Sequence, residues 1–160
     1  MQQRRQRARG AYPVQVAAVC FRHVGRTVEF LLVRTSSGRW TFPKGRLEDA
    51  LSLHEVAALE AMEEAGARGE VDPRPVGVYL HRKESLRGLL SKDVNVVAFV
   101  MKVRRAQLPS ESGRVPRWFD ACEARERLSQ RRSGEYRKSI ERVLDSALKR
   151  IANHRAARIA

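Results

Sequence analysis

Three carboxylates recur at helical spacing in the segment 43–67, whose sequence is PKGRLEDALSLHEVAALEAMEEAGA. Glu60, Glu63 and Glu64 stand at i, i+3 and i+4, so a helix would place them on one face. Like charges this close repel each other, and carboxylate oxygens are ligands for hard divalent ions such as Mg²⁺. Together with the Pro-Lys-Gly turn upstream, the pattern indicates metal-assisted chemistry on phosphates. A solvated acidic helix end is the alternative that spacing alone leaves open.

Capping signals predict a helix for this segment. Ser52 followed by Glu55 three residues later is the pattern of a capping box, and Gly66 suits the position just past the last turn. The residues between 57 and 64 are nearly all good helix formers. The three acids also continue an apolar stripe from the earlier turns, and carboxylates that lean inward must be paired or bound to metal.

The same segment resembles the signature of the Nudix hydrolases. Seven of the nine specified positions match at the required separations, namely Gly45, Glu60, Ala61, Glu63, Glu64, Gly66 and Ala67. Leu51 and Leu59 depart from the signature, because the family has there a Glu and an Arg that pair with each other. An apolar pair can replace an ion pair at little cost, so we expect these leucines to form an apolar brace. The three glutamates of the expected helix all match the signature.

The resemblance implies an α/β fold, a Nudix-type α/β/α sandwich with a mixed β-sheet, and a hydrolase that uses Mg²⁺ (or Mn²⁺). It implies that Glu60, Glu63 and Glu64 hold the metal, with a further ligand from the carbonyl of Gly45. Glu63 and Glu64 are the expected catalytic residues. Glu63 is a candidate general base, and Glu111 is a second candidate in the loop before a short Arg-Trp strand.

The Pro-Lys-Gly start is similar to the Nudix subgroup that acts on dinucleoside polyphosphates, and diphosphoinositol polyphosphate hydrolases have similar strands. We therefore expect a polyphosphorylated small-molecule substrate, cleaved at a phosphoanhydride and bound by several cations. The expected phosphate contacts are Lys44, Arg46, Arg34, Arg39, Arg82 and Lys83, with Lys92 as a further candidate. Tyr79, His81 and Trp118 are candidates for stacking on a base, although a core position is the preferred interpretation for Trp118.

Two other functions stay open at this point. The site could remove pyrophosphate from an RNA 5′ end, with the basic ends of the chain recruiting the RNA. Alternatively, Leu51 and Leu59 could mark a Nudix-fold module that binds a nucleotide without turnover.

Charge is concentrated at the two ends of the chain. The net charge is +14; residues 1–10 hold four arginines, and residues 121–160 hold eleven basic residues against five acidic ones. This distribution favours non-specific or RNA contact through the basic ends, or a solubilising surface. With 160 residues, we expect one Nudix domain over 11–152, flanked by a disordered basic tail at 1–10 and a basic tail at 153–160.

Cys20 and Cys122 are too few for a disulfide framework, and no apolar run is long enough for a membrane helix. A cytoplasmic protein without membrane contact is therefore expected.

Hydrophobic patterns predict a mixed sheet with helices on its faces. The expected strands are 14–22, 28–34, 39–42, 75–82, 93–103 and 117–119, and the expected later helices are 121–130 and 136–152. Residues 43–45, 83–92 and 106–116 are expected in loops.

Overall fold

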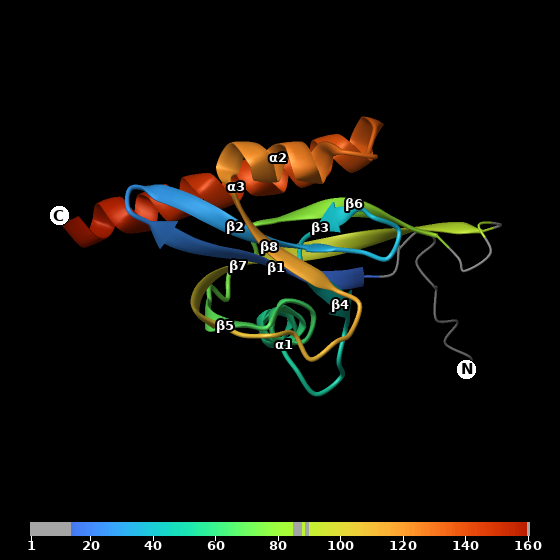
Figure 1. The fold of residues 1–160 in the computed structure, drawn as a ribbon, viewed down its shortest axis with the longest axis horizontal. Helices are drawn as coiled ribbons and strands as arrows, with labels where there is room; N and C mark the ends of the chain where they lie inside the picture. Colours follow the sequence, from blue (N-terminus) through green and yellow to red (C-terminus); the bar gives the residue numbers. More distant parts are fainter. Residues whose placement is uncertain (1–13, 85–87, 89, 160) are drawn as a thin grey trace, which may run out of the picture.

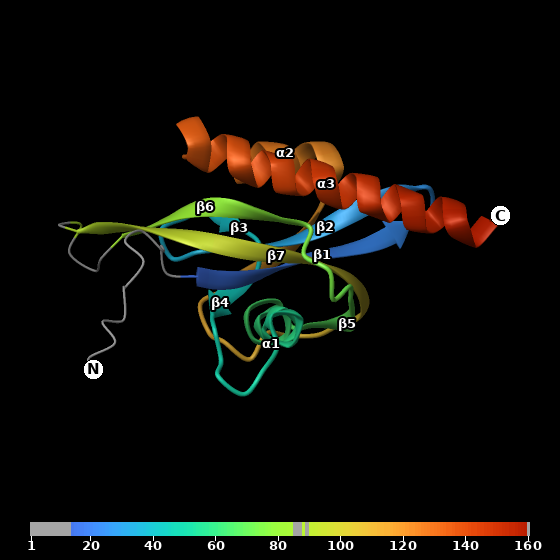
Figure 2. The same ribbon diagram turned by 180° about the vertical axis from the view of Figure 1, so that it is seen from behind.

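An eight-stranded mixed sheet separates two helical layers in the computed structural model of the chain, which describes residues 14–84, 88 and 90–159. Figures 1 and 2 show helix α1 on one face of the sheet and helices α2 and α3 on the other. The elements are β1 (Val14–Val24), β2 (Thr27–Arg34), β3 (Trp40–Thr41), β4 (Lys44–Arg46), α1 (Leu53–Ala65), β5 (Ala67–Val71), β6 (Gly77–Glu84), β7 (Ser91–Ala106), β8 (Val115–Asp120), α2 (Ala121–Ser129) and α3 (Gly134–Ile159). The α/β/α sandwich predicted from the sequence is thereby confirmed.

Strand β1 is the centre of the sheet, and both of its faces are covered. It pairs antiparallel with β2 and β4 and parallel with β7. Alternate residues serve the two cores: Val19 and Phe21 pack toward α2 and α3, whereas Ala18 and Cys20 pack toward α1. A strand buried on both faces has a nearly continuous apolar sequence, which explains the run VQVAAVCF.

Helix α1 begins and ends where the capping signals predict. The Glu55 carboxylate accepts a hydrogen bond from the Ser52 backbone N–H at 2.7 Å, and a capping box is present. Gly66 ends the helix at φ +64°, and its N–H donates to the Met62 carbonyl at 3.0 Å. Val56 and Ala57 are fully buried, so the predicted apolar stripe faces the sheet.

Two short strands were not predicted. Residues 44–46 form β4, which pairs with β1 from Gln15 to Ala17 instead of remaining a loop. Residues 67–71 form β5, which pairs with β7 through a register shift between Arg68 and Gly69. Three residues carry too little periodicity to identify a strand, and β5 is largely polar because its middle is exposed.

The hairpin strands and the last helix are longer than their apolar patterns. Strands β6 and β7 pair as far as Glu84 with Ser91, within the segment expected to be a polar connection. Helix α3 continues to Ile159, seven residues past the expected end. Buried residues stop at Ile151, so periodicity could not predict the last turns, although arginine and alanine there are good helix formers.

Other expectations concern the ends of the chain and membrane contact. The predicted tail at 1–10 lies outside the described residues. Among the helices of the described part, none is long and apolar enough to cross a membrane.

Replacing Gly66 by alanine should destabilise the fold. A Cβ there would lie 1.9 Å from the Gln107 carbonyl oxygen, which is backbone, and φ is positive. We expect a loss of about 1 kcal/mol from the left-handed conformation and roughly 1–3 kcal/mol more from the clash. Thermal unfolding should then show a melting temperature lower by at least about 4 °C.

Gly25→Ala is the matched control for this variant. Gly25 has φ +60° with nothing within 4 Å of a Cβ, so only the conformational cost applies. Equal destabilisation of the two variants would contradict the role assigned to the contact between Gly66 and the 107–114 loop.

Candidate active site

The carboxylates of α1 lie against the Pro-Lys-Gly segment, because β4 is hydrogen-bonded to the first residues of β1 directly beside this helix. A Cβ on Gly45 would lie 1.8 Å from Oε1 of Glu60. Only glycine therefore leaves room for the Glu60 carboxylate in this position. Gly45 and Glu60, which are fifteen residues apart in the sequence, are therefore in direct contact.

Glu64 is almost fully buried, at 4% exposure, and both of its oxygens have donors. The Lys44 backbone N–H donates to Oε2 at 3.1 Å, and Arg114 Nη2 lies 3.1 Å from Oε1. Burial raises the pKa of Glu64, an effect opposed by the charge of Arg114 and the Lys44 hydrogen bond. Arg114 was not among the residues predicted for the site.

The loop between β7 and β8 completes this face of the site. The backbone N–H of Glu111 donates to the Glu63 carbonyl at 2.9 Å, which fixes the loop on the last turn of α1. The Glu111 carboxylate lies 3.7 Å from Arg114 Nε. Glu111, the second candidate base from the sequence, therefore lies beside the glutamates of α1.

Glu60 lies near several other carboxylates, and its pKa is raised. Its pKa rises to about 7, first through burial and then through the charges of Glu64, Glu63 and Glu111. Such a cluster favours a cation, and carboxylate and carbonyl oxygens are the ligands that Mg²⁺ and Mn²⁺ prefer. The donor set therefore fits a divalent ion in its chemistry.

The side chains are nevertheless not gathered as a complete metal cage. Within residues 14–84, 88 and 90–159, no three His, Cys, Asp or Glu side chains lie together as a metal-binding group. The Glu64 oxygens are instead engaged by the Lys44 backbone N–H and by Arg114.

Lys44 projects into the sheet side of the site. Its Nζ donates to Oε1 of Gln15 at 3.3 Å, and burial lowers its pKa to about 8 despite the nearby charge of Glu64. A partly desolvated ammonium group with one neutral partner is well suited to bind phosphate oxygens. Gln15 was not predicted, since a polar residue near a strand start carries no distinctive signal.

A buried polar group adjoins Lys44 on β3, β6 and the connection between α2 and α3. Burial lowers the pKa of His81 to about 3, helped by the charges of Lys44, Arg39, Arg132 and Lys83. The charges of the predicted residues Lys44, Arg39 and Lys83 all act on His81, so these residues lie in one region of the structure.

Arg132 is an unpredicted member of this group. Its Nη1 donates to the Trp40 carbonyl at 3.0 Å. Its Nη2, the Tyr79 hydroxyl and the Thr41 hydroxyl are buried without a hydrogen-bond partner in the described part of the chain. Unsatisfied buried polar atoms are costly, so this region is prepared for water or a polar ligand.

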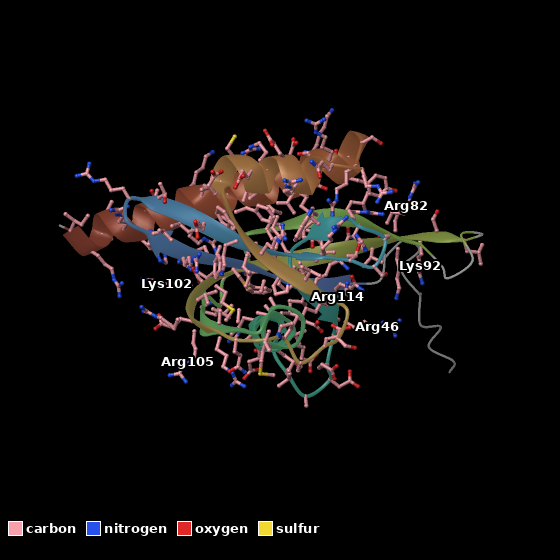
Figure 3. The ribbon with its side chains drawn as sticks, viewed as in Figure 1. Arg46, Arg82, Lys92, Lys102, Arg105 and Arg114 are labelled. Atoms are coloured by element: carbon pink, nitrogen blue, oxygen red, sulfur yellow. The ribbon has the colours of Figure 1, made fainter. Side chains whose placement is uncertain are left out.

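Two predicted cations point to other partners. Arg82 donates to the Tyr136 hydroxyl at 2.9 Å and stacks over its ring at 4.8 Å, on the α3 side. Figure 3 shows Arg82 and Lys92 toward the β6–β7 hairpin, whereas Arg46 and Arg114 lie near β4. Arg34 is exposed on β2, and a Cβ on Gly38 would lie 3.5 Å from its Nη2, so it faces the β2–β3 turn.

The structure bears on three expectations about apolar and aromatic residues. Tyr79 is 1% exposed and packs at 6.1 Å on Phe42, so its ring is not available for stacking on a base. Trp118 packs on the α1-side core, with Arg22 over its ring at 4.1 Å, which favours the core alternative. Leu51 is 38% exposed, so it lies outside the buried core, and the apolar brace with Leu59 stays a prediction.

Replacing His81 by asparagine should flatten the acid side of the stability curve. Below pH 6.5 the unfolded chain binds a proton at this residue, while the folded chain resists protonation down to about pH 3. The wild type therefore loses stability as the pH falls from 6.5 toward 3, by up to about 1.4 kcal/mol per pH unit from this group. Urea unfolding between pH 4 and 7 should show a smaller slope for His81→Asn, and identical slopes would contradict the pKa assignment.

Comparison with known proteins agrees with this geometry. A family profile described as NUDIX domain matches residues 11–142. Nudix hydrolase 13, mitochondrial, from Arabidopsis thaliana is 35% identical over 91 residues, which cover 53% of this chain and 45% of the relative. The chain spans about half the length of these curated relatives that it matches. The cytoplasmic location stays a prediction, since this relative is named as mitochondrial.

Solved structures share the fold. A Caenorhabditis elegans Ap4A hydrolase in a binary complex superposes with a TM-score of 0.62 at 19% identity, covering 88% of this chain and 98% of the other. The NUDIX domain of Shewanella oneidensis NrtR, complexed with ADP ribose, gives 0.64 at 14% identity, covering 89% and 90%. With the profile match over most of its length and the glycine–glutamate contact at its centre, the chain belongs to the NUDIX domain family.

Proposed function

We propose that the chain is a divalent-metal-dependent pyrophosphohydrolase. The observation that carries the proposal is the packing of Glu60 on Gly45, with Glu63, Glu64 and Glu111 around it. Glu60, Glu63, Glu64 and the Gly45 carbonyl are the groups that would hold Mg²⁺ or Mn²⁺. The ion would neutralise phosphate charge and make a water molecule more acidic.

The remaining groups orient the reaction. Glu63 is the candidate general base on α1. Glu111 is a second candidate, and its charge, like that of Glu63, acts on Glu60. Arg114 lies between Glu64 and Glu111. From there its guanidinium can stabilise the negative charge that develops on a departing phosphate. Gly45 is held by the pairing of β4 with β1, and Glu64 is held by the Lys44 backbone N–H and Arg114.

The cationic group beside the carboxylates supports a polyphosphate substrate. Lys44, Arg39, Lys83 and Arg132 all act on His81, so their charges converge on one region. A chain of several phosphates needs several cations, whereas a single phosphate does not. Binding an anion there would also relieve the mutual repulsion of these groups.

A dinucleoside polyphosphate is the leading substrate, and a diphosphoinositol polyphosphate is the second. The fold neighbour named Ap4A hydrolase supports the first. The number of converging cations is compatible with both. The neighbour complexed with ADP ribose makes that compound a necessary comparison.

A substrate panel tests the reaction class. Diadenosine tetraphosphate, ADP-ribose, nucleoside triphosphates, a diphosphoinositol polyphosphate and triphosphorylated RNA should be incubated with Mg²⁺ and with Mn²⁺, and products identified by chromatography. Metal-dependent cleavage of a phosphoanhydride is expected. Thermal stabilisation by a nucleotide without any product would instead favour the binding module.

Glu64→Gln should reduce metal-dependent turnover by more than about 100-fold, because even partners of metal ligands are worth 10- to 100-fold. The amide keeps the shape of the side chain but removes the charge. Exposed Glu48 provides the matched control, since Glu48→Gln makes the same change in the loop before α1. Turnover of Glu64→Gln within a few-fold of wild type, in protein with an unchanged melting temperature, would refute the assignment.

Arg114→Gln should strengthen binding of Mn²⁺ measured by electron paramagnetic resonance. Arg114 engages Glu64 at 3.1 Å, so it competes with the ion for this carboxylate. We expect an affinity gain of roughly 3- to 10-fold, which corresponds to about 1 kcal/mol. Arg105→Gln, an exposed cation of β7, should have no effect. Weaker Mn²⁺ binding by Arg114→Gln would contradict the competition.

A further inference from the structure

A second groove lies between the last turns of α3 and the far end of the sheet. Its volume is about 800 Å³, within the range of small-molecule sites, and its lining includes none of the carboxylates of α1. Figure 3 shows Lys102 at this end of the sheet, opposite to Arg46 and Lys92. Phe21, Val100 and Ile151 provide an apolar floor.

Three elements change from apolar to basic along this groove, and the change on β7 comes two residues earlier than the change on β1. The pairs are Phe21 and His23 on β1, Val100 and Lys102 on β7, and Ile151 and Arg155 on α3. On β1 and β7 the register aligns Phe21 with Lys102. The groove therefore has an apolar inner part and a basic outer part.

The basic side is not neutralised by the acids of the groove. Lysine and arginine outnumber aspartate and glutamate by five to two in its lining. Asp72 is paired with Arg74 at 2.9 Å and with Arg150 at 3.7 Å, and Glu70 is paired with Arg104 outside the groove.

The remaining cations act on one another. Neither Lys102 nor Arg155 has a carboxylate within ion-pair distance among the residues that the structure describes. In the part of the chain that the structure describes, the Arg155 guanidinium donates a hydrogen bond to the Arg26 carbonyl at 3.4 Å. Burial lowers the pKa of His23, and the charges of Lys102 and Arg155 lower it further. Convergent cations without a counter-charge favour an anion.

The dipole of α3 does not account for this cluster. Cations near a helix C-terminus are stabilised by the dipole, which explains a basic residue such as Arg158. Lys102 and His23, however, belong to strands of the sheet. Because strands have only small net dipoles, a backbone dipole does not explain why Lys102 and His23 lie here.

We propose that this groove binds a phosphomonoester with an apolar or aromatic head group, such as a nucleoside monophosphate. The phosphate would contact Lys102 and Arg155, and the head group would lie over Phe21 and Ile151. The proposal concerns a site separate from the α1 carboxylates and does not depend on their activity.

Histidine ring resonances can locate such a ligand in the full-length wild-type protein. The chain has four histidines: His23 and His154 line the groove, His81 lies at the candidate active site, and His54 lies on α1. AMP titrated in EDTA at low salt should shift the His23 and His154 signals. Adenosine and inorganic phosphate, which each lack half of the ligand, should bind at least about 10-fold more weakly.

Paired variants test the contacts. Lys102→Ala with Arg155→Ala should weaken AMP binding at the groove by about 10-fold or more. Arg105→Ala with Lys149→Ala removes one exposed cation from each of the same two elements outside the groove, and it should leave binding unchanged.

Three results would overturn the proposal. One is an AMP titration of wild type that shifts His81 but neither His23 nor His154. Another is inorganic phosphate binding as tightly as AMP, which would exclude recognition of a head group. The third is equal loss of affinity in the two double variants.

Discussion

The arrangement depends on how closely a carboxylate-bearing helix can approach the backbone of strand β4. Glu60 occupies the space that a side chain at position 45 would fill, and the amide of Lys44 donates to Glu64. A helix and a strand held this closely concentrate negative charge where burial weakens its screening. Burial first, and then this charge, raises the pKa of Glu60, and a divalent cation is the natural counter-ion of the cluster.

The sheet supplies the positions from which the other groups reach this charge. The first residues of β1 hold β4 and contribute Gln15, while β6 contributes His81 and the β7–β8 loop contributes Glu111 and Arg114. Alternate residues of each strand point to opposite faces of the sheet and pack in different cores. The same alternation, continued past the core at the opposite end, produces the basic groove below α3.

Sequence reasoning worked where the signal is local. Capping residues and the glutamate spacing located α1 to the residue, and long apolar runs located β1, β2 and β7. It also placed Glu111 as a candidate, because a loop acid before the Arg-Trp strand fits the family pattern.

It failed where position depends on contacts between distant segments. Arg114 and Arg132 come from connections whose paths follow from tertiary packing, and their side chains bond to atoms tens of residues away. Tyr79 has the composition of a stacking residue, but its strand turns the ring into the core. Leu51 shows the opposite case, since an apolar residue replacing a charged one did not become buried. Short strands such as β4 form because neighbours offer hydrogen bonds, not because three residues prefer extension.

The most direct test of the account is a crystal structure of the chain soaked in Mn²⁺, with the metal located by its anomalous signal. The account predicts a peak among the Glu60, Glu63 and Glu64 carboxylates and the Gly45 carbonyl, with Arg114 displaced from Glu64. A peak at another place, or an undisturbed pair of Glu64 and Arg114 at saturating Mn²⁺, would contradict it.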